Sequence, residues 1–290
     1  SETLAMTRKS RELKAMGHNV INLSIGEPDF FTPNYIKEAA KKAIDDNFSF
    51  YPPVAGYQDL REVICKKLLD ENNLTYTPDQ IIVSTGAKQS IANAVLATVD
   101  PGDEVLVPSP YWVSYREIIK LAEGKPVYIP TSIETNFKVT PSMIEKYITP
   151  KTKLIIYSSP CNPSGSVYNY NELKELSVLF EKYPNIYIIS DEIYEKINFT
   201  GNPHYSIAQF NNIKERVILV NGVSKGYAMT GWRLGYMAAE KSIAQACDKI
   251  QGQFTSATSS ISQRAAIAAL SKQTDDVKNM VEQFKIRRDH

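Results

Sequence analysis

Histidine and cysteine are scarce in this 290-residue sequence, which contains three of each. The cysteines are far apart and form no CxxC pair, so neither a disulfide framework nor a zinc site is indicated. The histidines, His18, His204 and His290, are equally dispersed, and none lies near the other strand ends that carry polar side chains. We therefore expect no metal centre.

Two common nucleotide-binding motifs are also missing. The sequence has no GxxxxGK[ST] loop and no GxGxxG after a predicted strand, which argues against nucleoside triphosphates and dinucleotides as ligands. The 33 lysines and arginines nearly cancel the 32 acidic residues, so net charge gives no reason to expect nucleic acid or an anionic membrane as a partner. A small-molecule ligand fits this composition better.

Long apolar stretches are absent as well. No segment is long and apolar enough to span a bilayer, and the amino end lacks the apolar core of a signal peptide. The composition, 43% hydrophobic and 22% charged, is that of a globular protein. We expect a cytoplasmic protein that does not associate with membranes.

Short β-branched apolar runs alternate with helical segments from about residue 80 onward, which is the pattern of an α/β fold. The runs are continuously apolar, as expected for strands that helices cover on both faces. We therefore predict a three-layer sandwich around a mostly parallel, seven-stranded sheet. The predicted strands are 81–83, 104–107, 126–129, 153–157, 186–189, 217–220 and 235–238, and the predicted helices include 88–99, 114–121, 171–182 and 243–254.

The first thirty residues have a different pattern. They predict a helix, a short strand in "VINLSIG" (20–26) and a turn in "GEPDFFTP" (26–33), with no clear connection to the sheet.

Polar and small side chains gather where four of the predicted strands end. The segments read "STGAKQS", "SSPCNPSG", "SDEIYEK" and "NGVSKGYAMTGWR". In open α/β sheets, ligands bind beyond the carboxyl ends of the strands. These four segments are therefore the candidate binding site.

The segment "STGAKQS" follows a strand and opens a helix. Gly86, Ala87 and Lys88 would present free backbone N–H groups to an anion such as a phosphate, with help from the helix dipole. The alternative is an ordinary helix N-cap with small residues. Asp191 likewise has two interpretations, as a helix cap or as a carboxylate that pairs with a protonated nitrogen, and Tyr194 follows it by three residues.

Lys225 lies at the end of a buried strand, where desolvation would lower the pKa of its amine and make it nucleophilic. A lone lysine more often extends to solvent. Arg233 is either a surface ion-pair partner or a clamp for a bound anion. Asn162 lies in a probable turn sequence, and Trp112 would stack on a planar ring or pack in the core.

Together, these residues would bind a ligand that has a phosphate, a planar ring, a basic ring nitrogen, a phenolic oxygen and an aldehyde. Pyridoxal phosphate has all five features, and it uses a carboxylate to keep its ring nitrogen protonated. The matching residues, in the order of those features, are Gly86, Ala87, Lys88, Ser224 and Arg233 for the phosphate, Trp112 for the ring, Asp191 for the nitrogen, Asn162 and Tyr194 for the phenolic oxygen, and Lys225 for the aldehyde.

Nearly the whole chain resembles the fold-type I pyridoxal-phosphate aminotransferases of classes I and II. The motifs that carry the resemblance are "IGEPDF", "YPPVAGYQDLREVI", "STGAKQSIANA", "DPGDEVLVPSPYWVSY", "SSPCNPSGSVY", "SDEIYE" and "SKGYAMTGWRLGY". Within this family the sequence is most similar to the bacterial-type aspartate aminotransferases. The resemblance implies that Lys225 forms the Schiff base with the cofactor, and it implies for the other residues the cofactor contacts given above.

The resemblance also implies a homodimer with active sites at the subunit interface. Tyr51 matches a tyrosine that reaches the phosphate of the neighbouring subunit's cofactor. Gly26 matches a backbone position beside the substrate carboxylate, and Lys88 matches a lysine that meets the distal carboxylate of a dicarboxylic substrate. Trp112 and Asn162 would also contact the substrate.

The family pattern extends beyond both ends of this chain. We expect residues 1–30 to belong to the small domain, 31–280 to form the large cofactor-binding domain, and 281–290 to begin an incomplete small-domain region. In the family, an arginine binds the α-carboxylate of the substrate. We assign no residue of this sequence to that role.

The predicted activity is amino transfer from an L-amino acid, with L-aspartate as the best candidate, to 2-oxoglutarate by a ping-pong mechanism. Two alternatives keep the cofactor: an aminotransferase for aromatic or prephenate-type substrates, and a β-lyase. A third, of another class, is a catalytically silent cofactor-binding or dimerisation fragment.

Overall fold

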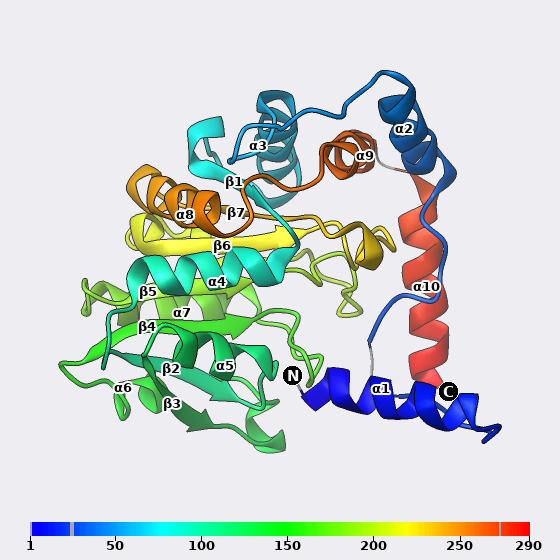
Figure 1. Cartoon of the computed structure of the whole chain (residues 1–290). Helices are drawn as coiled ribbons and strands as arrows, with labels where there is room; N and C mark the ends of the chain where they lie inside the picture. The colour runs from blue at the N-terminus through cyan, green and yellow to red at the C-terminus, as the bar shows by residue number, and fades with distance from the viewer. Residues whose placement is uncertain (1, 24–25, 273) are drawn as a thin grey trace.

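The computed structural model describes residues 2–23, 26–272 and 274–290. One seven-stranded sheet runs through it in the order β1-β7-β6-β5-β4-β2-β3 (Figure 1). The pairs β2/β3, β2/β4, β4/β5 and β5/β6 are parallel, and β7 is antiparallel to both of its neighbours. The strands are β1 (Ile81–Ser84), β2 (Glu104–Ser109), β3 (Lys125–Pro130), β4 (Thr152–Ser158), β5 (Tyr187–Asp191), β6 (Val217–Gly222) and β7 (Gly235–Ala238). All seven predicted strands and the mostly parallel sheet are confirmed.

Helices cover both faces of the sheet and create two separate apolar cores. Because successive side chains of a strand point to opposite faces, Ile218 and Val220 of β6 enter one core, while Val217 and Leu219 enter the other. The first core is covered by α4 (Ala87–Thr98), α5 (Ser114–Leu121) and α8 (Lys241–Phe254), and the second by α2 (Asn34–Asp45), α3 (Gln58–Asn72), α7 (Tyr170–Glu181) and α9 (Ser260–Ser271). The predicted three-layer sandwich is confirmed.

A glycine allows β7 to approach the beginning of α4. A Cβ atom at Gly235 would lie 2.2 Å from the backbone nitrogen of Ala87, so no other residue fits there without displacing the backbone. This close packing brings the first turn of α4 beside the segment that follows β6.

The predicted strand in residues 20–26 is wrong for the part that the structure describes. Val20 to Leu23 and Gly26 are not in a strand, and Ser24 and Ile25 lie outside the described residues. The side chains of Ile21 and Leu23 are 84% and 90% exposed, and none of the described strands pairs with this segment. Apolar β-branched residues form a strand only where a sheet edge offers hydrogen-bond partners. The helix predicted before this segment is α1 (Glu2–Ala15).

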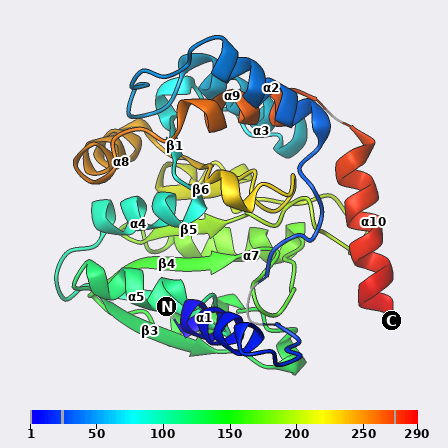
Figure 2. The ribbon, with the colours of Figure 1, turned by 45° about the vertical axis from the view of Figure 1, so that its right-hand side comes forward.

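The carboxyl end contacts the amino-terminal segment. The ring of Phe284 meets the edge of Phe30 at 5.2 Å, and Arg287 pairs with Asp29 at 2.7 Å. Figure 2 shows the helix concerned, α10 (Asp275–Asp289), standing at the margin of the molecule outside the sandwich. The remaining helix is α6 (Pro141–Glu145). The predicted domain boundary near residue 280 falls inside α10 and stays a prediction.

Among the residues that the structure describes, no helix combines the length and the apolar character needed to cross a membrane.

Candidate active site

A cavity of about 540 Å³ opens beyond the carboxyl ends of β4, β5 and β6 and beside the first turn of α4. Each of these strands ends at, or shortly before, a residue that lines it: Ser158, Asp191 and Ser224. This is where open α/β sheets bind ligands. The other lining residues are Leu23, Gly26, Ala87, Lys88, Ile91, Tyr111, Trp112, Val113, Tyr115, Asn162, Pro163, Ile193, Tyr194, Lys225, Thr230 and Arg233.

Asp191 is the last residue of β5, and its carboxylate is buried at the floor of the cavity. The hydroxyl of Tyr115 donates to Oδ2 at 2.7 Å, and the backbone N–H of Ile193 donates to Oδ1 at 3.3 Å. Burial raises the pKa of Asp191 to about 6, although the Tyr115 hydroxyl and the Ile193 N–H oppose the shift. Above that pH, Asp191 is an ionised carboxylate able to bind a protonated ring nitrogen.

Tyr194 and Asn162 form a hydrogen-bonded pair in the same cavity. The Asn162 side-chain amide donates to the Tyr194 hydroxyl at 3.3 Å, although the two residues belong to segments after different strands. Burial raises the pKa of Tyr194, and the nearby Asp191 carboxylate raises it further. The phenol is therefore neutral at physiological pH, and it offers a hydrogen-bond donor next to the amide.

Lys225 places its ammonium group between the cavity and the amino-terminal segment. Its Nζ donates to the backbone oxygen of Gly26 and lies 5.7 Å from the centre of the Tyr194 ring. Burial lowers the pKa of Lys225; Glu27 raises it, and Arg233 lowers it further. A desolvated lysine beside another cation gives up its proton more easily, which makes the amine a better nucleophile.

Arg233 lies against the first turn of α4. Its Nη1 donates to the backbone oxygen of Thr230 at 2.8 Å, and a Cβ atom at Gly86 would lie 2.4 Å from its Nη2. The first N–H groups of a helix, here those of Ala87 and Lys88, have no acceptor within the helix. The guanidinium and these amides together form an anion-binding corner, with Ser224 also lining the cavity.

Lys88 lies over the indole of Trp112, with its Nζ 4.9 Å from the ring centre. Trp112 also meets the ring of Tyr115 edge to face at 5.5 Å. Burial, together with the charge of Arg233, lowers the pKa of Lys88. Lys88, Lys225 and Arg233 therefore face a cavity whose described lining has one carboxylate, Asp191, so positive charge is in excess there. Anionic ligands are favoured.

The cavity collects almost every residue that the sequence pointed to. Two of those residues do not line the cavity. Gly86 lies behind Arg233 and leaves room for that side chain. Tyr51 is 98% exposed and lies outside the lining. The roles of these residues stay predictions.

Sequence reasoning did not select Tyr115, which holds the Asp191 carboxylate. One signal was available, because Tyr115 follows Trp112 by three residues and so lies about one helical turn further along. Two further lining residues, Ser158 and Thr230, were missed because single hydroxyl residues are common at strand ends and in loops.

The chain belongs to a known family: residues 18–290 match the model of aminotransferase class I and II. The predicted family resemblance is therefore confirmed, and with it the class of enzyme, a transaminase.

Individual relatives narrow the comparison. The chain is 49% identical to an aspartate/prephenate aminotransferase from Nitrosomonas europaea, over 99% of this chain and 72% of that protein. It is also 49% identical to a bifunctional aspartate aminotransferase and glutamate/aspartate-prephenate aminotransferase from Petunia hybrida, with all of this chain but 61% of the plant protein covered. A solved aspartate aminotransferase from Thermus thermophilus with maleate superposes with a TM-score of 0.96 at 39% identity, covering 100% of this chain and 75% of that one.

Proposed function

We propose that this cavity holds pyridoxal 5'-phosphate and transfers amino groups between amino acids and 2-oxo acids. The observation that carries the proposal is the presence of Lys225, Asp191 and Arg233 in one cavity, each beside groups that suit one part of that cofactor. The buried carboxylate of Asp191 fits a protonated ring nitrogen, and the corner at Arg233 fits a phosphate.

The remaining cavity residues fit the rest of the group. Trp112 would stack on the ring, and the pair of Asn162 and Tyr194 would hydrogen-bond the phenolic oxygen. Ala87 and Ser224 line the cavity and would complete the phosphate site, and Gly86 would contribute by leaving room for Arg233 beside the first turn of α4. When bound, pyridoxal phosphate supplies an electron sink for the bonds to the amino acid α-carbon.

The chain itself contributes binding and proton transfer. Lys225 would hold the group through its aldehyde, and the amine of Lys225, once an amino acid has taken its place, would act as the base for the substrate α-proton. The lowered pKa of Lys225 keeps part of the amine neutral and able to accept that proton. Asp191 would hold the ring nitrogen in its protonated form, and the positive charge of that nitrogen would in turn lower the pKa of the carboxylate, which burial raises.

We further propose L-aspartate as the amino donor and 2-oxoglutarate as the acceptor. Lys88, Gly26, Trp112 and Asn162 line one cavity. Lys88 would supply a cation for the distal carboxylate of such substrates, and Gly26 would lie beside the α-carboxylate. The names of the relatives support this choice. Those names also favour a second candidate, amino transfer to prephenate.

A product assay tests the proposal. The cofactor-loaded protein is incubated with L-aspartate and either 2-oxoglutarate or prephenate, while oxaloacetate and pyruvate are measured separately. Oxaloacetate with the first acceptor is the expected result, and oxaloacetate with prephenate alone would select the second candidate. Pyruvate and ammonia released, without any added oxo acid, from an amino acid that carries a leaving group on Cβ, such as L-cystathionine, would indicate a β-lyase. Protein that binds the cofactor without any product would be a silent fragment.

We also propose that two copies of the chain pair, so that Tyr51 of each reaches the phosphate of the other's cofactor. The 98% exposure of Tyr51 leaves it free for such a contact. Mixing Tyr51→Phe protein with Lys225→Ala protein tests this directly. Hybrid dimers have one site with both original residues, so activity should reappear on mixing if the tyrosine acts across the interface.

A further inference from the structure

A cluster of charged side chains, most of them buried, lies behind the active-site segment that follows β5. We call it the reverse-face cluster, and its members are Lys67, Glu71, Glu192, Glu195, Lys196 and His204. None of them lines the cavity. The geometry points to a positioning role: this cluster holds the segment from Asp191 to Lys196, and the backbone beside Lys225, in place for the cofactor. The inference rests on the proposed function.

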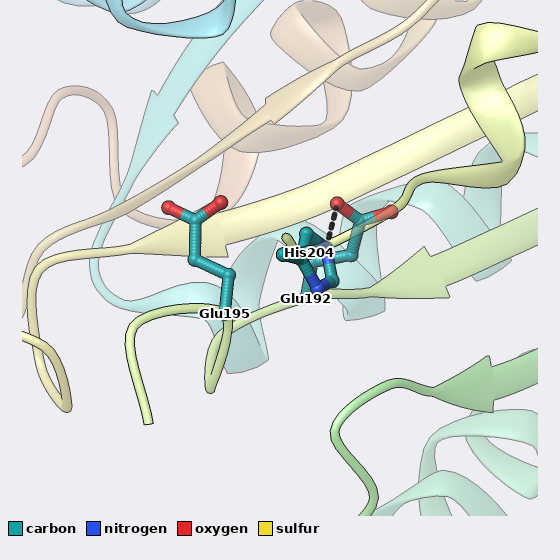
Figure 3. A group of neighbouring side chains, drawn as sticks. All are labelled: Glu192, Glu195 and His204. Carbon is teal, nitrogen blue, oxygen red and sulfur yellow. Dashed lines mark hydrogen bonds and ion pairs between the residues drawn. The ribbon is translucent and has the colours of Figure 1, made fainter. Parts of the chain in front are cut away.

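Residues of this segment divide between its two sides. Asp191 and Tyr194 line the cavity, whereas the carboxylates of Glu192 and Glu195 enter the reverse-face cluster. Figure 3 shows Glu192, Glu195 and His204 as neighbours, with His204 hydrogen-bonded to Glu192. Any displacement of the two glutamates therefore moves the backbone that carries the two cofactor-facing residues.

Glu192 is fixed by three partners. Its Oε1 accepts from Ser190 at 2.8 Å and from Ser206 at 2.6 Å, and its Oε2 lies 2.9 Å from His204 Nε2. The side chain is 1% exposed, and that of His204 is 8% exposed. Water therefore does not compete for these bonds, and each bond constrains the residue after Asp191.

Glu195 is held by α3. Its Oε1 pairs with Lys67, and its Oε2 accepts from the Asn72 amide at 3.0 Å. Lys67 also donates to Asn72 at 2.8 Å and lies 3.5 Å from Glu71, while its side chain is 1% exposed. A buried lysine with three polar partners on two elements fixes the helix and the segment relative to each other.

The cluster also touches the backbone next to Lys225. Lys196 pairs with Glu71 at 2.7 Å, and its stem packs on Gly226, where a Cβ atom would lie 2.8 Å from Lys196 Cγ. One continuous set of contacts therefore supports both chain segments that carry the proposed cofactor contacts.

The charges within the cluster balance when His204 is protonated. Three carboxylates, from Glu71, Glu192 and Glu195, then face the cations of Lys67, Lys196 and His204. Burial disfavours protonated His204, but the adjacent carboxylates, Glu192 first, outweigh it and raise the pKa. The ammonium of Lys67 already occupies Glu195. For this reason we interpret the grouping of Glu192, Glu195 and His204 as an ion-pair network rather than a metal centre.

Removing one cation tests the inference. Lys67→Met keeps the length of the side chain but leaves three carboxylates against two cations. The matched control is Lys138→Met, which breaks a pair with Glu172 in a different part of the fold, where the lysine is 16% exposed. For each protein, the dissociation constant of pyridoxal phosphate, the visible absorption of the bound cofactor and the thermal midpoint are measured.

We expect Lys67→Met to weaken cofactor binding by roughly tenfold or more and to shift the absorption band, because small displacements of positioned groups have large effects. Lys138→Met should leave both readouts unchanged. The double variant Lys67→Met, Glu195→Gln restores the charge balance and should recover most of the affinity. If Lys67→Met does not fold, Lys196→Met removes a cation of the same cluster that is 26% exposed, and it should weaken cofactor binding in the same direction.

Two results would separate the inference from the proposed function. If the unchanged protein does not bind pyridoxal phosphate, the proposed function itself fails. If it binds, but the variant that lacks the cation merely lowers the thermal midpoint and keeps the original affinity and spectrum, or the double variant recovers none of the lost affinity, the cluster is only structural and the inference is overturned.

Discussion

The two sides of the segment after β5 differ in their balance of positive and negative side chains. On the cavity side, Lys88, Lys225 and Arg233 face one carboxylate, that of Asp191, in the lining that the structure describes. On the other side, the six members of the reverse-face cluster pair with one another in a buried set of equal positive and negative charges.

This difference separates a binding site from its support. Buried charge is costly unless it is paired, so an excess of one sign in a cavity favours the binding of a ligand of the other sign. A balanced cluster needs no ligand and instead fixes the elements that it joins. Substitutions on the cavity side should therefore change catalysis more than stability, and those on the reverse side should change both.

The largest effect is expected for Lys225→Ala. Loss of the amine removes both the bond to the cofactor and the proton transfer, and proton transfer alone contributes about 10²- to 10⁴-fold to the rate. Turnover in the aspartate assay should become undetectable, while some cofactor still binds through Arg233. Lys241→Ala serves as control, because Lys241 pairs with Asp79 and lies outside the cavity lining. Appreciable turnover by the Lys225 variant would contradict the assignment.

A pair of adjacent substitutions compares the two sides directly. Asp191→Asn removes the cavity carboxylate and should lower kcat roughly 10- to 100-fold, the value of a hydrogen bond to a charged group. Glu192→Gln removes a reverse-face charge and should lower the thermal midpoint more than Asp191→Asn does, because Glu192 has three partners. If the two variants lose similar amounts of thermal stability and of kcat, the proposed difference between the two sides is contradicted.

A smaller effect is expected for Tyr115→Phe, in the pH dependence of turnover. The Tyr115 hydroxyl lowers the pKa of Asp191, which burial holds at about 6, so its loss should raise that pKa. Tyr194, Glu192 and Cys161 are the other titratable groups near this pair. The acid limb of the kcat profile should move to higher pH by up to about one unit. Tyr157→Phe is the control, because the Tyr157 hydroxyl forms a hydrogen bond with Ser190 and not with Asp191. An equal movement of the acid limb in that variant would contradict the assignment.

The smallest effect concerns stability at the extremes of pH. Glu195 is buried, yet Lys67, His204 and Lys196 lower its pKa from 4.5 to about 2. Its contribution to the free energy of unfolding is therefore complete above about pH 4.5 and is lost as the pH falls toward 2. Since the pKa of His204 is raised from 6.5, its contribution is complete below that pH and is lost as the pH rises through the folded-state value.

Denaturant unfolding across pH, compared between the unchanged protein and single variants, measures these contributions. Glu195→Gln should reduce the loss of stability at acid pH, and His204→Gln should reduce the loss at alkaline pH. Parallel curves for all three proteins would show that neither group titrates as the cluster requires.

The sequence was sufficient to predict the sheet and most of the cavity, for a physical reason. Parallel buried strands are continuously apolar, so their ends are visible in the sequence, and the chemistry of the fold gathers at those ends. Asp191 and Lys225 could be selected in this way because each ends or closely follows an apolar run, and Arg233 because it lies just before the next one. The strand predicted at residues 20–26 failed where it can be judged, because a local pattern does not reveal whether a sheet edge is available.

The reverse-face cluster could not be predicted in the same way. Lys67 lies in the middle of α3, where a lysine ordinarily indicates an exposed position, and its partner Glu195 is in a distant part of the chain. Its burial depends on how α3 packs against the sheet, which no local pattern records. Tyr115 falls between these cases, because its position near Trp112 was visible and its bond to Asp191 was not.

The most direct test of the central claim is chemical fixation of the cofactor. The protein is loaded with pyridoxal phosphate, reduced with borohydride and digested, and the labelled peptide is identified by mass spectrometry. The account predicts one phosphopyridoxyl label on Lys225, absent from Lys225→Ala protein. A label on Lys88 or another lysine in place of Lys225, or no label at all, would contradict it.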